Sequence, residues 1–155
     1  MSRERYEQHR SGLFRNVHYL DVRKRFPYPD NTFHFVYTSH LLEHLVPAHT
    51  EFCVSEIYRV LRPGGIVRIA VPDLDQIVAS YDPQNPVPWL DSFFEAGQKN
   101  PKNRHHWHYN EVSMRRLLEK VGFQEICRCE FRQGRCADIA ILDRRPESLF
   151  MEAVK

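Results

Sequence analysis

The side chains best suited to proton transfer in this sequence are histidines, which gather in two stretches. His44 lies in the first, Ser39–Leu45. Because an unperturbed imidazole titrates near neutral pH, we interpret His44 as a candidate proton acceptor. The alternative is a histidine that is hydrogen-bonded beneath a sheet. The second stretch, residues 104–109, is either the wall of an acceptor-binding pocket or a structural surface loop. Its candidate residues are His106, Trp107, His108 and Tyr109.

No metal site is predicted. Cys127 and Cys129 are separated by one residue, whereas paired zinc ligands are usually separated by two to four, and no fourth ligand follows Cys136 at a fitting spacing. Two cysteines on one face of a strand is the favoured interpretation. The clustered histidines of residues 105–108 should point in divergent directions, so a single ion is not expected to bind all three.

The hydrophobic pattern predicts alternating strands and helices. Strands are expected at Val17–Val22, Phe33–Thr38, Ile66–Val71, Gln124–Phe131 and Ala137–Asp143, and helices at Ala48–Arg62, Leu90–Ala96 and between Asn110 and Gly122. The last two strands should form an antiparallel hairpin, and the tail Ser148–Val154 could add a short extended piece. The whole of residues 1–155 is predicted to be one domain, with residues 1–16 as a polar arm or helix.

This order of elements is typical of an α/β sheet that is mostly parallel and has an antiparallel C-terminal hairpin. In such sheets ligands bind beyond the carboxyl ends of the strands. The rule nominates the residues that follow the predicted strands, which are Asp21, Val22, Ser39, His40, Pro72, Asp73 and Asp75.

Three segments resemble the type 11 branch of class I S-adenosylmethionine (SAM) methyltransferases. Residues 26–33, FPYPDNTF, resemble that family's LPFPDNSFD; residues 40–45, HLLEHL, resemble HVLEHL; and residues 56–65, EIYRVLRPGG, resemble its E-x-x-RVLKPGG segment. A small branch of predicted methyltransferases also has RIAVPDLD, here residues 68–75. The resemblance extends from about Val17 to Lys155 and implies a Rossmann-like sheet.

The resemblance implies SAM as cofactor and gives roles to several residues. Asp21 would accept from the adenine amine while Val22 packs on the ring; the alternative for Asp21 is a cap of the following turn. Ser39 and His40 would line the reaction centre, with His40 and His44 as the catalytic candidates; Ser39 could instead be a helix N-cap. Asp73 joins residues 106–109 as a candidate for binding the acceptor.

One part of the family pattern is missing from these 155 residues. The family's first strand leads into a Gly-x-Gly loop beside the methionine end of SAM, and its second strand ends in an acid that holds the ribose. The sequence contains six glycines and no Gly-x-Gly. The domain is therefore expected to be truncated at its N-terminus, with exposed sheet edges that favour a homodimer.

The predicted function is methyl transfer from SAM to a small-molecule or saccharide acceptor. The alternative is a non-catalytic methyltransferase-like protein, degenerate or completed by a partner chain, that acts through binding or assembly. A net charge of +2 gives no electrostatic argument for a nucleic-acid partner. The sequence has no membrane-span pattern, and its polar start does not resemble a signal peptide, so the predicted location is cytoplasmic.

Overall fold

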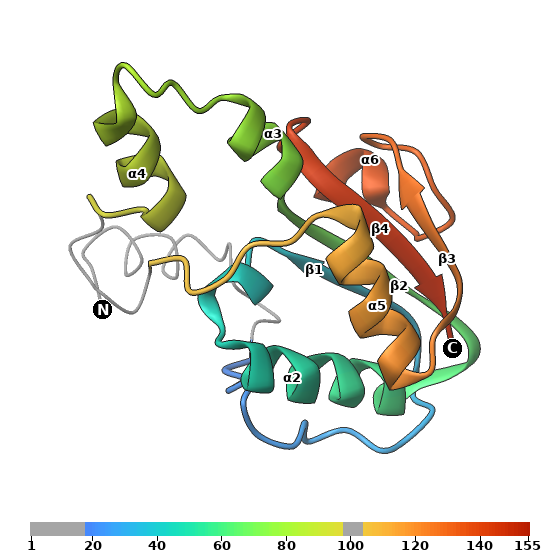
Figure 1. Cartoon of the computed structure of the whole chain (residues 1–155). Helices are drawn as coiled ribbons and strands as arrows, with labels where there is room; N and C mark the ends of the chain where they lie inside the picture. Colours follow the sequence, from blue (N-terminus) through green and yellow to red (C-terminus); the bar gives the residue numbers. More distant parts are fainter. Residues whose placement is uncertain (1–17, 98–103) are drawn as a thin grey trace, which may run out of the picture.

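A mixed four-stranded sheet forms the centre of the fold. The structure is a computed structural model that describes residues 18–97 and 104–155. Strands β1 (Phe33–Ser39), β2 (Leu61–Pro72), β3 (Gln124–Cys129) and β4 (Ser148–Val154) lie in the order β1-β2-β4-β3 (Figure 1). β1 is parallel to β2, whereas β4 is antiparallel to both of its neighbours. The C-terminal strand therefore occupies the interior of the sheet.

Two long helices, α2 (Pro47–Val60) and α5 (Glu111–Val121), lie together over one face of the sheet (Figure 1). α5 buries Met114 and Leu118, and its ends follow from its flanking residues. The Asn110 side chain accepts a hydrogen bond from the Ser113 amide at 3.0 Å, and Gly122 ends the helix with a left-handed φ of 110°. Both ends agree with the predicted helix.

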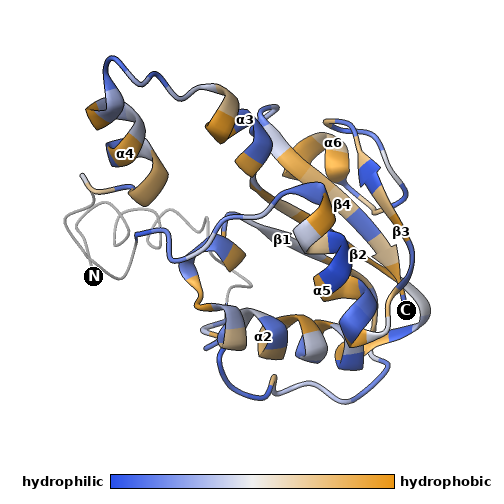
Figure 2. Cartoon of the chain, in the orientation of Figure 1, coloured by the Kyte–Doolittle hydropathy of each residue, from blue (hydrophilic) through white to orange (hydrophobic). Residues whose placement is uncertain are grey.

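The remaining helices are short: η1 (Leu42–His44), α3 (Leu74–Ala79), α4 (Pro86–Phe94) and α6 (Ile139–Leu142). Figure 1 shows α4 standing away from the sheet, and Figure 2 shows that α4 carries both hydrophobic and hydrophilic residues. None of its residues is buried. Within the described ranges, no helix has the length and apolar character needed to cross a membrane.

Two of the predicted strands are wrong. Residues 18–21 have no regular secondary structure and lead into a turn at Val22 and Arg23, so no strand forms there; Val17 lies outside the described residues, as does the predicted polar arm. Residues Ala137–Asp143 contain helix α6, so the expected hairpin is not formed there. The partner of β3 is β4, the tail for which only a short extended piece was predicted. A short apolar run such as residues 139–142 fits either a strand or a helix, and only its packing decides between them.

A buried arginine links the sheet to the connection between β3 and β4. Arg68 on β2 is 0% exposed and donates to the carboxylates of Asp143 and Glu152 at 2.6–3.1 Å. It also donates to the carbonyl oxygens of Glu130 and Gln133 at 3.0 and 2.9 Å. All five guanidinium N–H groups therefore have acceptors, and each buried carboxylate has a charged partner.

A second ion pair holds the 26–33 loop against α2. The Glu56 carboxylate accepts from the Phe26 amide at 2.7 Å and from the Arg59 guanidinium at 2.7 and 2.8 Å. Arg59 also donates to the carbonyl oxygen of Tyr28 at 2.9 Å and to Asp30. The E-x-x-R segment thus fixes the loop that precedes β1.

Replacing Arg68 should strongly destabilise the fold. In Arg68→Met the two carboxylates remain buried without their cation, so we expect urea unfolding to show a loss of about 3–5 kcal/mol at pH 7. Arg116→Met, at an exposed position of α5, is the matched control and should change stability by less than about 0.5 kcal/mol. Equal losses in both variants would contradict the role of Arg68.

Replacing Glu56 should have an effect that depends on pH. Hydrogen bonds from Arg59 hold the pKa of Glu56 below its usual value. Its stabilisation is therefore present above the ordinary glutamate pKa and is lost as the pH falls through the lowered folded-state pKa. We expect Glu56→Gln to cost about 2 kcal/mol at neutral pH and less at about pH 3, measured by urea unfolding. Glu51→Gln, in an exposed ion pair, should cost under about 1 kcal/mol. A Glu56→Gln cost that stays constant with pH would refute this assignment.

Candidate functional site

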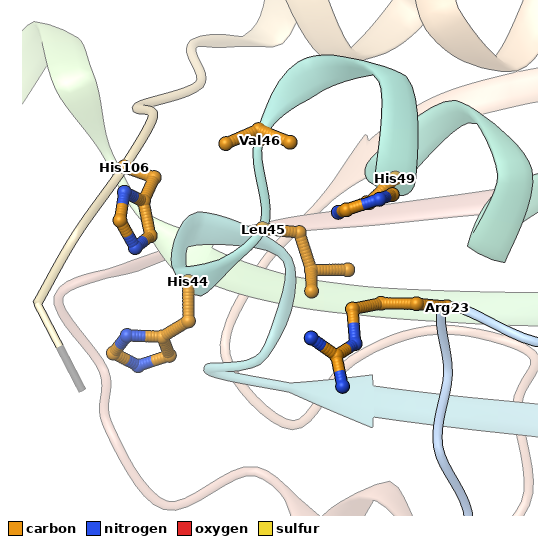
Figure 3. A pocket seen from close by; sticks show the side chains of 6 residues that line it. All are labelled: Arg23, His44, Leu45, Val46, His49 and His106. Atoms are coloured by element: carbon orange, nitrogen blue, oxygen red, sulfur yellow. The ribbon is translucent and has the colours of Figure 1, made fainter. Parts of the chain in front are cut away.

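A pocket of about 400 Å³ lies just beyond the carboxyl end of β1, beside η1 and the start of α2. Figure 3 shows the imidazole rings of His44 and His106 on one side of it and the side chains of Arg23 and His49 on the other. Leu45 and Val46 complete its lining. The lining combines imidazole rings with apolar side chains, and its one guanidinium, that of Arg23, is paired with Asp21. Because the His44 side chain lines this pocket, it is accessible to a ligand, as a catalytic candidate must be.

A second pocket, of about 300 Å³, adjoins the first because His106 lines both. Its remaining lining residues come from α3, α4 and the 104–109 segment and are Leu74, Phe93, Phe94, His105, Trp107 and His108. The predicted wall 106–109 is therefore brought into pockets at three of its four positions. The exception is Tyr109, which is buried and donates to the Thr50 hydroxyl at 3.1 Å.

The 104–109 segment is fixed to η1 through Glu43. The amides of His106 and Trp107 donate to the Glu43 carbonyl oxygen at 2.7 and 3.2 Å. The Glu43 side chain is 0% exposed; its Oε1 lies 3.1 Å from His40 Nδ1, and its Oε2 has no hydrogen-bond partner within the described part of the chain. A buried carboxylate that is only half satisfied lies at the junction of the two pockets.

His40 and His44 differ in how many of their ring nitrogens are engaged. His40 lies between Glu43 and Ser148, with Nδ1 and Nε2 at 3.1 and 3.0 Å from their oxygens. His44 Nδ1 lies 3.2 Å from the Arg104 carbonyl oxygen, and no hydrogen bond of its Nε2 is found among residues 18–97 and 104–155. Of the two catalytic candidates, His44 is the one whose free nitrogen can reach a ligand.

Ser39 is exposed at the end of β1 and does not cap a helix. The following helix η1 begins at Leu42 with Leu41 in the N-cap position, and no side chain caps it. The alternative role considered for Ser39 is therefore wrong. Its position at the carboxyl end of β1 leaves it available to a ligand.

Asp21 and its neighbours form a turn instead of the end of a strand. The Asp21 carboxylate accepts from the Arg23 amide and guanidinium at 2.8–3.2 Å, and these bonds lower its pKa to about 2. The turn-capping alternative is thus observed. The same turn places Arg23 in the first pocket, which puts Asp21 near the carboxyl end of β1.

Asp73 is 2% exposed and serves the local structure. Its carboxylate accepts from the Asp75 amide at 3.1 Å, which caps α3, and from Arg128 at 2.9 Å. Of the residues predicted to bind the acceptor, Asp73 and Tyr109 are buried with partners, and residues 106–108 line pockets.

Four polar or charged residues in or next to these pockets were not named as site residues from the sequence: Arg23, Glu43, His49 and His105. Burial lowers the pKa of His105 and of His108, which favours their neutral rings. His105 was part of the histidine string, yet nothing in the pattern distinguished it from His106. Glu43 lies between Leu42 and His44, and the sequence around it does not indicate whether its carboxylate is exposed to solvent or buried. Its burial could therefore not be predicted.

The two cysteines of β3 lie on one face of the strand, as predicted. Their sulfur atoms are 3.8 Å apart, and burial raises the pKa of Cys129 to about 12. Burial also raises the pKa of Cys136 to about 11. The thiols of Cys129 and Cys136 are therefore protonated at neutral pH.

The family model of the methyltransferase domain matches residues 4–127, and the chain belongs to this family. A curated relative, the ubiquinone/menaquinone biosynthesis C-methyltransferase UbiE of Blochmanniella floridana, is 26% identical over 124 residues. The match covers 74% of this chain and 48% of the relative, so the chain spans about half the length of the curated relative it matches.

Solved SAM-dependent methyltransferases have the same fold. The structure from Archaeoglobus fulgidus matches with a TM-score of 0.59 at 18% sequence identity. The match covers 90% of this chain and 67% of the Archaeoglobus chain. The structure from Thermotoga maritima matches with a TM-score of 0.60 at 16% sequence identity. The match covers 99% of this chain and 70% of the Thermotoga chain. The fold is thus the α/β, Rossmann-like fold of class I methyltransferases, truncated relative to these structures, and the cofactor of this class is SAM.

Proposed function

We propose that this domain transfers a methyl group from SAM to a small-molecule acceptor, and that its described residues form mainly the acceptor side of the active site. The observation that carries the proposal is the pair of adjoining pockets at the carboxyl end of β1, joined at His106. Ligands of open α/β sheets bind at this edge. Such a transfer depends mainly on positioning, and pockets lined by imidazole and aromatic groups suit that task.

One end of the cofactor fits the described residues. The Asp21 carboxylate accepts three hydrogen bonds, all from Arg23, and an ionised carboxylate has about four acceptor sites. One site thus remains for the adenine amine, with Val22 beside it. Ser39 and His40 end β1, where the methionine end would lie. When bound, SAM supplies the methyl group on a sulfonium sulfur.

The ribose and methionine groups lack their usual partners in this sequence, since it contains no Gly-x-Gly. The free edge of β1 indicates where additional structure would pair. β1 has a single strand neighbour within the described part of the chain, and an apolar pocket of about 220 Å³ lies beside it, lined by Phe33, Phe35 and Val36 among others. A second copy of this chain pairing at this edge would cover these side chains.

The adenine assignment predicts binding of S-adenosylhomocysteine to the chain. By calorimetry we expect measurable heat at millimolar ligand, and Asp21→Ala should weaken binding about 10- to 100-fold, because a hydrogen bond to a charged group contributes about 1.5–3 kcal/mol. Asp82→Ala, at an exposed position, is the matched control and should bind like the wild type. If titration of the wild-type chain with S-adenosylhomocysteine produces no heat of binding, this proposal is wrong.

The second-copy proposal predicts a dimer that one charge can dissociate. Phe35 on β1 is 43% exposed and lines the apolar pocket. We expect sedimentation equilibrium to show a wild-type dimer and a Phe35→Lys monomer, because a charged lysine at an edge opposes strand pairing. Val112→Lys, at an exposed position of α5, should remain dimeric. A monomeric wild-type chain would exclude pairing between copies without touching the cofactor proposal.

A further inference from the structure

We propose that Glu43, His44 and His105 form a binding site for a divalent metal ion of the zinc type. Each residue offers one donor atom, and these three atoms all lie within 4.8 Å of one another. The site was not expected from the sequence, which indicated only that neighbouring histidines diverge. His44 and His105 are distant in sequence and are brought together because the 104–109 segment is bound to the Glu43 backbone.

The state of each donor atom supports ligation. Glu43 Oε2 and His105 Nδ1 are buried, and neither has a hydrogen-bond partner among the described residues. An unpaired buried carboxylate oxygen is costly, and a cation compensates that cost. Both of these atoms belong to residues of the three-residue cluster, so the unsatisfied groups and the clustered donors occur in the same residues.

The opposite atom of each ligand is held by a neighbour. Glu43 Oε1 lies 3.1 Å from His40 Nδ1, and His44 Nδ1 lies 3.2 Å from the Arg104 carbonyl oxygen. His105 Nε2 lies 3.5 Å from the Glu95 carboxylate. A metal-binding histidine usually donates its other ring N–H to a carbonyl or carboxylate, which orients the ring and leaves the ligating nitrogen with its lone pair.

The donor set is one carboxylate and two imidazoles. This is a set of protein ligands found in catalytic zinc sites, which keep a further coordination position open. His44 faces the first pocket and His105 the second, so the open position would face their junction. Donors about 2.1 Å from a tetrahedral ion lie about 3.4 Å apart, so donor atoms within 4.8 Å of one another must approach by up to about 1.4 Å. With His44 as a ligand, its lone pair holds the ion instead of accepting a proton.

The test is calorimetric titration of the wild-type chain with Zn²⁺ alone, without SAM, so its result is independent of the proposed function. We expect one ion per chain and no binding of Mg²⁺, which favours all-oxygen octahedral sites. Glu43→Gln and His105→Ala should each lose at least about 100-fold in affinity. Glu95→Gln should lose about 10- to 100-fold, the range measured when residues behind metal ligands are changed.

Two controls identify the site. His34→Ala removes an exposed histidine of β1 and should bind Zn²⁺ like the wild type. The double change Cys127→Ser and Cys129→Ser removes two thiols whose sulfur atoms lie 3.8 Å apart and should also leave binding intact. Absence of Zn²⁺ binding to the wild type would overturn the proposal. Full affinity in Glu43→Gln and His105→Ala, or loss in the cysteine variant, would also overturn it.

A stability measurement separates metal binding from a purely structural role. Without metal, Glu43→Gln removes a buried charge of which one oxygen has no partner among the described residues, so we expect it to unfold at a temperature no lower than the wild type. Added Zn²⁺ should raise the unfolding temperature of the wild type and leave that of Glu43→Gln unchanged. Bound Co²⁺ should give visible absorption typical of mixed nitrogen and oxygen ligands, lost in His105→Ala. Equal Zn²⁺ shifts in wild type and variant would refute the site.

Discussion

The buried charge of Arg68 is the constraint on which the C-terminal half of the fold depends. Burying a guanidinium is unfavourable unless every N–H finds an acceptor, and here Asp143, Glu152 and two carbonyl oxygens supply them. These acceptors come from β4 and from the long connection between β3 and β4. The same network excludes a side chain at Gly134, because a Cβ there would collide with both Glu152 and Arg68. The position of the final strand and the path of the connection are thus set by one cation on β2.

Glu43 is buried as completely as Arg68, but its environment is different. The carboxylates around Arg68 accept from several donors each, whereas one oxygen of Glu43 has none within the described ranges. A fold that satisfies one buried charge fully and leaves another half satisfied points to the second as a place where something binds. The Glu43 backbone also holds the 104–109 segment, whose residues line both pockets. A ligand bound at Glu43 would therefore affect the lining of both pockets.

The sequence predicted those elements whose ends are set locally. α5 has an N-cap, an apolar period of 3.6 and a terminal glycine, and these fix it without reference to the rest of the chain. Residues 137–143 and Ser148–Val154 have no such signals. Which of the two pairs with β3 depends on the ion network around Arg68, whose members lie up to 84 residues apart in sequence. Residues 18–22 have strand propensity, but the Asp21–Arg23 contacts stabilise a turn that begins at Asp21, and no strand forms.

The site was predicted only in part, for a related physical reason. Residues that end a strand can be nominated from topology alone, and Ser39 and His40 were nominated in this way. The partner of His44 could not be found, because the choice of His105 over His106 depends on which ring turns inward once two amides bind the Glu43 carbonyl oxygen. The HLLEHL segment therefore has two roles. Its backbone binds the distant 104–109 segment, and its side chains Glu43 and His44 lie close to His105 of that segment. A change at Glu43 that altered only its side chain would separate these roles, since the backbone contacts to His106 and Trp107 would remain.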